Sequence, residues 1–71
     1  MGGIYKEYVE ISDLFAILKW NNFDMVETLL PFIKDINETV DGINILFQAK
    51  VIEHDISSDI IELLEESGAF L

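Results

Sequence analysis

The stretch Asp41-Gly42-Ile43-Asn44-Ile45-Leu46-Phe47-Gln48-Ala49 places turn-forming residues directly before an apolar run. Val40-Asp41-Gly42 predicts a tight turn, because Asp and Gly tolerate the backbone angles that turns require. The residues from Asn44 to Ile52 carry apolar side chains at helical spacing. This part of the chain is therefore predicted to form a turn followed by a helix.

The same arrangement occurs earlier in the chain. Leu46-Phe47 repeats Leu14-Phe15 at an offset of 32 residues. Ile60-Ile61-Glu62 repeats Met25-Val26-Glu27 at an offset of 35, so three residues are inserted between the second pair of helices. A period near 33 residues with two short helices per unit is typical of a helical repeat.

Capping residues and a proline predict the limits of the first two helices. Ser12 or Asp13 is expected to cap a helix over residues 14–18. Asn21-Asn22 is expected to cap the next helix. That helix should end near Leu30, because Pro31 cannot donate a backbone hydrogen bond.

The last helix is predicted to be amphipathic, with acidic residues on its outer side. Ser57 and Ser58 predict its start, and Gly68 predicts its end because glycine suits the left-handed position after a helix. Residues 4–11 are ambiguous at the other end of the chain. We expect them to be helical or irregular and able to cover the first repeat.

Residues 41–49 resemble the ankyrin-repeat stretch D-G-x-T-P-L-H-x-A, with Asn, Ile and Phe in place of Thr, Pro and His. Residues 62–69 resemble the end of the second ankyrin helix, and residues 24–30 and 35–37 resemble the matching part of the first copy. The resemblance covers about residues 12–71. It implies an all-α fold of two stacked helix-turn-helix repeats, about 12–40 and 41–71, behind a short N-terminal capping segment. A generic antiparallel four-helix assembly, also all-α, is the alternative.

Composition limits the classes of protein to which the chain can belong. Its 71 residues suffice for one domain, here residues 1–71, and 51% hydrophobic residues favour a folded core. A net charge of −10 would repel nucleic acid and anionic membranes. No apolar run is long enough to span a membrane and no secretion signal is visible, so we expect a soluble cytoplasmic protein.

The residues needed for catalysis or metal binding are nearly absent. The chain has no cysteine and no arginine, and its single histidine, His54, lies between Glu53 and Asp55 on an expected loop. No phosphate-binding or calcium-binding loop motif occurs. We therefore expect no enzyme activity, no cofactor and no metal, with His54 solvated.

A protein-binding surface is the remaining hypothesis. The ankyrin resemblance implies that loop tips and the exposed faces of the first helix of each repeat would contact a partner. Trp20 is either a binding hot spot or a core residue. The acidic C-terminal residues either solubilise the protein or attract a basic partner. The candidate partner-binding residues are Lys19, Trp20, Glu38, Asp41, Gln48, Glu53, Asp55, Asp59 and Glu62.

Two functions follow as hypotheses. The first is an acidic inhibitor, of the immunity-protein or antitoxin type, that binds and blocks a basic protein. Eleven isoleucines and no arginine suggest an AT-rich bacterial or viral genome. The second is a self-associating scaffold or adaptor. In that case Phe70 and Leu71, on an end expected to lack a polar cap, form the contact of a homodimer.

Overall fold

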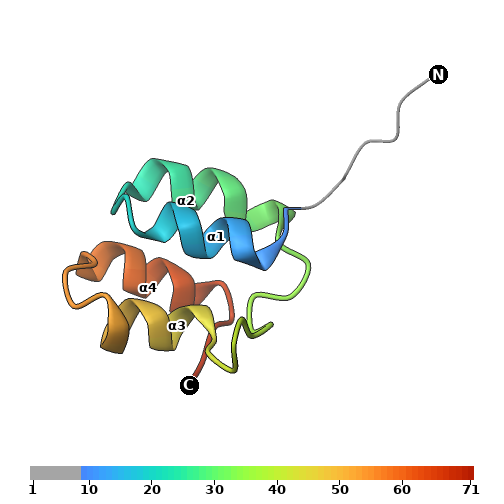
Figure 1. Ribbon diagram of the computed structural model, residues 1–71. Coiled ribbons are helices and arrows are strands. Elements are labelled where there is room, and N and C mark those ends of the chain that lie inside the picture. The colour runs from blue at the N-terminus through green and yellow to red at the C-terminus, as the bar shows by residue number, and fades with distance from the viewer. Residues whose placement is uncertain (1–8) are drawn as a thin grey trace.

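The computed structural model describes residues 9–71, which form two helix hairpins (Figure 1). Hairpin 1 consists of α1 (Ile11–Leu18), α2 (Phe23–Leu29) and the short 3₁₀ helix η1 (Leu30–Phe32). Hairpin 2 consists of α3 (Ile45–Phe47), its π-helical continuation η2 (Gln48–Ile52), and α4 (Ser58–Glu66). The described residues contain no strand, only isolated bridges at Val9–Ile33 and Val40–Ile43, so the all-α prediction is confirmed for them.

Asparagine side chains cap the starts of α2 and α3. Asn22 Oδ1 accepts a hydrogen bond from the Met25 N–H at 3.3 Å, as the sequence predicts. Asn44 Oδ1 accepts one from the Phe47 N–H at 2.9 Å. Pro31 lies in the first turn of η1, where the α-helical pattern of α2 has already ended.

The start of α1 differs from the prediction. The helix begins at Ile11 behind an extended Glu10, so Ser12 and Asp13 lie in its first turn and neither caps it. Ile11 is buried, and we attribute the earlier start to the burial of this side chain in the core. Residues 4–8 of the ambiguous segment lie outside the described residues.

The first and last residues of α4 agree with the prediction, but the side chain of its N-cap residue does not cap the helix. Ser57 is the N-cap residue, but its side chain makes no capping hydrogen bond. Its N–H instead donates to Asn21 Oδ1 at 2.9 Å. Gly68, with φ of +102°, adopts the left-handed conformation expected after the helix.

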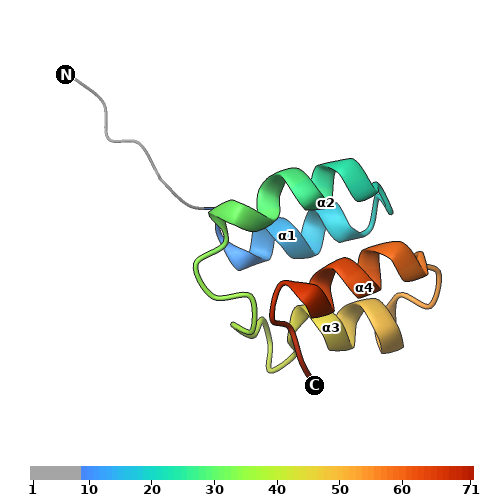
Figure 2. The same cartoon turned by 180° about the vertical axis from the view of Figure 1, so that it is seen from behind.

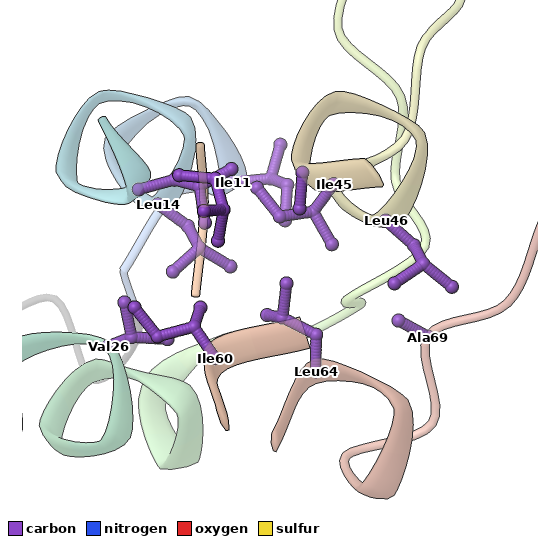
Figure 3. Close-up of a cluster of buried hydrophobic side chains, with 11 residues drawn as sticks. Ile11, Leu14, Val26, Ile45, Leu46, Ile60, Leu64 and Ala69 are labelled. Atoms are coloured by element: carbon purple, nitrogen blue, oxygen red, sulfur yellow. The ribbon is translucent and has the colours of Figure 1, made fainter. Parts of the chain in front are cut away.

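The hydrophobic core lies between the two hairpins. Figure 3 looks along the helices and shows α1 beside α3 and α2 beside α4, with apolar side chains pointing into the space between them. Each hairpin therefore buries one of its sides on the other hairpin. The largest fully buried side chains are Leu14, Leu18, Val26, Ile45, Ile60 and Leu64.

The loops inside the two hairpins lie at the same end of the molecule (Figures 1 and 2). Asn21 and His54 occupy matching places in these loops, with φ of +53° and +56°. Asn tolerates this left-handed conformation better than most residues, which suits Asn21 to its place in the first loop. The tip between the hairpins, Asp41-Gly42, lies at the opposite end.

Candidate protein-interaction surface

Large apolar side chains are exposed where α1 and η2 end. Trp20 is 66% exposed and comes shortly after α1. Ile52, the last residue of η2, is 46% exposed and lies 32 residues later, at the matching position of the second hairpin. Val51 beside it is also exposed. Trp20 is therefore a surface residue and not a core residue. We call Trp20, Val51 and Ile52 the apolar ridge.

A groove beside α1 brings three of the predicted partner-binding residues together. Lys19, Asp41 and Gln48 line a depression of about 320 Å³ between α1 and the tip, whose walls also include Phe15 and Val40. The tip is fixed by reciprocal backbone hydrogen bonds between Val40 and Ile43, at 2.9 and 3.0 Å. The lining of this groove thus contains a positively charged side chain, a carboxylate and apolar side chains.

Two predicted residues have other surroundings. Glu38 lines a different hollow, of about 450 Å³, next to the start of α1. Glu53 is half-buried and its Oε2 accepts a hydrogen bond from Gln48 Nε2 at 2.7 Å. The backbone of the same two residues closes the π-helical turn, since the Glu53 N–H donates to the Gln48 carbonyl at 2.9 Å. Gln48 and Glu53 therefore stabilise η2.

The outer side of α4 carries an acidic stripe, which we define as Asp59, Glu62 and Glu66. These carboxylates are exposed and lie three and four residues apart, hence on one side of the helix. They surround a depression of about 220 Å³ that also includes Phe23, at the start of α2, and Leu63. An aromatic ring among carboxylates is suited to a cationic side chain.

The structure therefore separates the predicted partner-binding residues into different surfaces. In Figure 3, α1 and α3 form one row of helices, and α2 and α4 form the other. Lys19 and Trp20 come directly after α1, whereas Asp59 and Glu62 belong to α4 in the other row. Asp55 is exposed in the loop between η2 and α4. The two rows differ in charge: α2 and α4 contain six carboxylates and no lysine, whereas α1, α3 and η2 together contain one carboxylate and one lysine.

The C-terminal residues form an apolar groove at the tip end. Phe70 and Leu71 are 66% and 70% exposed. They line a depression of about 470 Å³ together with Ile43 and Phe47. Asn44 and Asn37 hold the backbone of this segment in place through hydrogen bonds to Phe70.

The outer side of hairpin 2 carries an ion pair, whereas Phe70 and Leu71 at the C-terminal end are exposed. Lys50 Nζ lies 3.1 Å from Glu65 Oε2, and both side chains are partly exposed. At the repeat offsets these two residues match Leu18 and Leu30 of hairpin 1. On the outer side of hairpin 2, a polar pair therefore stands where hairpin 1 has two leucines.

Chemistry-bearing groups do not converge in the described part of the chain. His54 is exposed, and residues 9–71 contain no group of three or more His, Cys, Asp and Glu residues that could hold a metal ion. No helix in this range is long and apolar enough to cross a membrane. The chain matches no known protein family, no curated protein and no solved structure.

Sequence reasoning missed Phe23 in the acidic depression and the Lys50–Glu65 pair on the end of hairpin 2. In the sequence, Phe23 is one of several apolar residues that follow Asn21-Asn22, and nothing there marks it as a surface residue. The ion pair had a signal in the sequence, because the offsets of 32 and 35 already align Lys50 with Leu18 and Glu65 with Leu30. A comparison of the repeats position by position reveals it.

Proposed function

We propose that this chain is a non-catalytic, ankyrin-like interaction module that binds and blocks a basic protein. The acidic stripe beside Phe23 is the observation that carries the proposal. Its carboxylates would form ion pairs with Lys or Arg side chains of the partner. Phe23 would contact the apolar stem or the face of one of these cations.

The stripe has an electrostatic cost that a cationic partner would remove. Glu62 and Glu66 lie four residues apart on one helix, a spacing at which like charges repel. Glu66 also lies at the C-terminal end of α4, where the helix dipole disfavours a negative charge, and the last turn contains no basic residue. Acidic residues in these positions are therefore better explained by binding than by stability.

The test uses a fluorescently labelled helical peptide with arginines at positions i, i+3 and i+7, which matches the spacing of the stripe. Binding is measured by anisotropy at low and high salt. We expect the variant Asp59→Asn/Glu62→Gln/Glu66→Gln to bind at least about tenfold more weakly at low salt, and wild-type affinity to fall as salt rises.

The matched control is Asp13→Asn/Glu38→Gln/Asp41→Asn, which removes three charges from residues outside α4. It should retain most of the affinity. An equal loss in both triple variants would mean that net charge, and not the stripe, attracts the peptide. Affinity independent of salt would contradict the proposal altogether.

Self-association is the second candidate function, and the groove at Phe70 and Leu71 favours it. In a homodimer this groove would be covered by the same residues of a second copy. Because each copy carries a charge of −10, added salt should strengthen the dimer, whereas it weakens binding to a basic partner. Sedimentation of wild type and Phe70→Glu/Leu71→Glu across salt concentrations separates the two functions: a mass that is monomeric throughout contradicts the dimer.

A further inference from the structure

The side chains of Asn37 and Asn44 bind the main chain of Phe70. Asn37 Oδ1 accepts a hydrogen bond from the Phe70 N–H at 3.1 Å, and Asn44 Nδ2 donates one to the Phe70 carbonyl. Both hydrogen-bonding groups of this residue's main chain are therefore recognised by side chains. Because only main-chain atoms take part, the recognition does not depend on which side chain the bound residue carries.

Both asparagines are held in position by other contacts. Asn44 Oδ1 accepts the capping hydrogen bond from the Phe47 N–H at 2.9 Å, so α3 sets the orientation of its amide. The Asn37 N–H donates to Asp35 Oδ1 at 3.0 Å. Neither contact involves Phe70. The two asparagines therefore keep their geometry when Phe70 moves away, which lowers the entropy cost of binding another segment.

Phe70 and Leu71 can leave this place at little cost. They are 66% and 70% exposed, so little buried apolar surface is lost with them. Ala69, by contrast, is buried in the core, and its N–H donates to the Leu64 carbonyl at 3.0 Å. Ala69 and α4 therefore stay in place when the chain turns away after Ala69.

The groove beside Phe70 is not filled by the side chains of its own segment. Ile43 and Phe47 are walls of this depression of about 470 Å³, which also reaches Thr39 and Gly42. The described residues that line it are all uncharged. The main chain of Phe70 is thus anchored, while an apolar surface beside it stays exposed. A segment whose side chain lies on this surface buries more apolar area than Phe70 does.

We propose that Asn37 and Asn44 bind one residue of an extended segment of another protein, in the place that Phe70 occupies. That residue offers its N–H and C=O to the two asparagines and places a large apolar side chain on Ile43 and Phe47. The segment is extended because a residue inside a helix uses both groups in intrahelical hydrogen bonds. Phe70 is then a competitor on the same chain, and its presence lowers the affinity for the partner.

A segment of another protein fits this groove better than a second copy of this chain does. A second copy would bring its own acidic α4 to the groove together with Phe70, and two chains of net charge −10 repel each other. The uncharged lining instead suits an apolar segment without acidic residues. The groove shares no residue with the acidic stripe, so this contact does not depend on the proposed binding of a basic protein.

The test is an NMR titration of the full ¹⁵N-labelled chain with the end-blocked peptide Ser-Gly-Ala-Phe-Leu, which has the sequence of residues 67–71. Free of α4, this peptide can place its Phe side chain on the groove. We expect saturable shifts of the side-chain amide signals of Asn37 and Asn44. A second peptide carries a methyl group on its Phe nitrogen and so lacks the N–H that Asn37 accepts. Because one hydrogen bond is lost, it should bind about two- to tenfold more weakly.

Variants at position 70 test the competition. Phe70→Pro removes the N–H that holds the competing segment to Asn37, so affinity for the peptide should rise at least about twofold. The matched control Phe70→Leu keeps this N–H and should bind like wild type. Asn44→Asp, added to Phe70→Pro, keeps the acceptor that caps α3 and loses the donor to the peptide carbonyl. Affinity should then fall about two- to tenfold.

Three results would overturn the proposal. Equal affinity for the two peptides would mean that the main chain is not recognised. An absence of shifts in Phe70→Pro at millimolar peptide would mean that the groove binds no extended segment. Shifts of the same two amide signals when the protein is concentrated without peptide would mean that a second copy occupies the groove.

Discussion

Asn37 Oδ1 accepts a hydrogen bond from the Phe70 N–H at 3.1 Å, and Asn37 Nδ2 donates one to the Gly68 carbonyl at 2.9 Å. One side chain thus connects the segment after hairpin 1 to the segment after hairpin 2. The contact joins residues 33 positions apart in the sequence. It fixes the C-terminal segment on which the groove at Phe70 and Leu71 depends.

Replacing Asn37 with Ala should lower the free energy of unfolding by about 1–2 kcal/mol, because two hydrogen bonds are lost. Asn37→Asp retains the acceptor for Phe70 and loses the donor to Gly68, so its effect should be intermediate at neutral pH. Urea titration followed by circular dichroism measures both. Thr39→Ala, at an exposed neighbouring position, is the control. An unchanged urea midpoint in Asn37→Ala would contradict this role.

The helix limits were predictable wherever local chemistry determines them. Asn22 and Asn44 accept hydrogen bonds from the first turns of their helices, and Gly68 adopts a left-handed conformation. These interactions involve residues within a few positions of one another. The start of α1 was not predictable in this way, because Ile11 is buried by residues distant in the sequence.

The candidate surface was predictable only in part. The repeat offset places Trp20 and Ile52 at equivalent positions, but whether a tryptophan after a helix faces the core or solvent depends on tertiary packing. The depression shared by Phe23 and the acidic stripe also lies between residues of two different hairpins. A list of residues taken from one sequence does not show that Lys19 and Glu62 belong to different rows of helices.

The matching loop residues Asn21 and His54 should respond differently to glycine. Both adopt φ near +55°, a conformation that costs a residue with a side chain roughly 1 kcal/mol. His54→Gly should therefore stabilise the fold by about this amount. Asn21→Gly gains less relief, because Asn tolerates this conformation, and it loses the acceptor for the Ser57 N–H, so its net effect should be near zero or destabilising.

Thermal unfolding of the two variants measures this difference directly. The control is Ser58→Gly, an exposed first-turn position of α4, which should lower the melting temperature because glycine disfavours helix. If Asn21→Gly and His54→Gly raised the melting temperature equally, the hydrogen bond between Asn21 and Ser57 would contribute nothing to stability.

The Lys50–Glu65 pair should limit association more than it stabilises the monomer. An exposed ion pair contributes only about 0.2–1 kcal/mol to folding. The variant Lys50→Leu/Glu65→Leu gives hairpin 2 the leucines that hairpin 1 has at the matching positions, and so extends the apolar surface of hairpin 2. It should therefore sediment as a larger species than wild type at the same concentration.

The exchange variant Lys50→Glu/Glu65→Lys is the matched control for that experiment. It keeps one charge of each sign at this end of the molecule and should sediment like wild type. A wild-type mass for the double leucine variant would mean that other features of the surface, and not this pair, prevent association.

Trp20 and Ile52 should be dispensable for folding. Because both side chains are largely exposed, Trp20→Ala and Ile52→Ala should each change the free energy of unfolding by less than about 0.5 kcal/mol. Leu18→Ala, two residues before Trp20 and fully buried, should instead cost about 2–5 kcal/mol. Chemical unfolding followed by circular dichroism compares the three variants.

The fluorescence of Trp20 gives an independent check, since its emission maximum should change little when the wild type unfolds. A large red shift on unfolding would mean that Trp20 is buried in solution, and the apolar ridge would then have to be removed from the candidate binding surface.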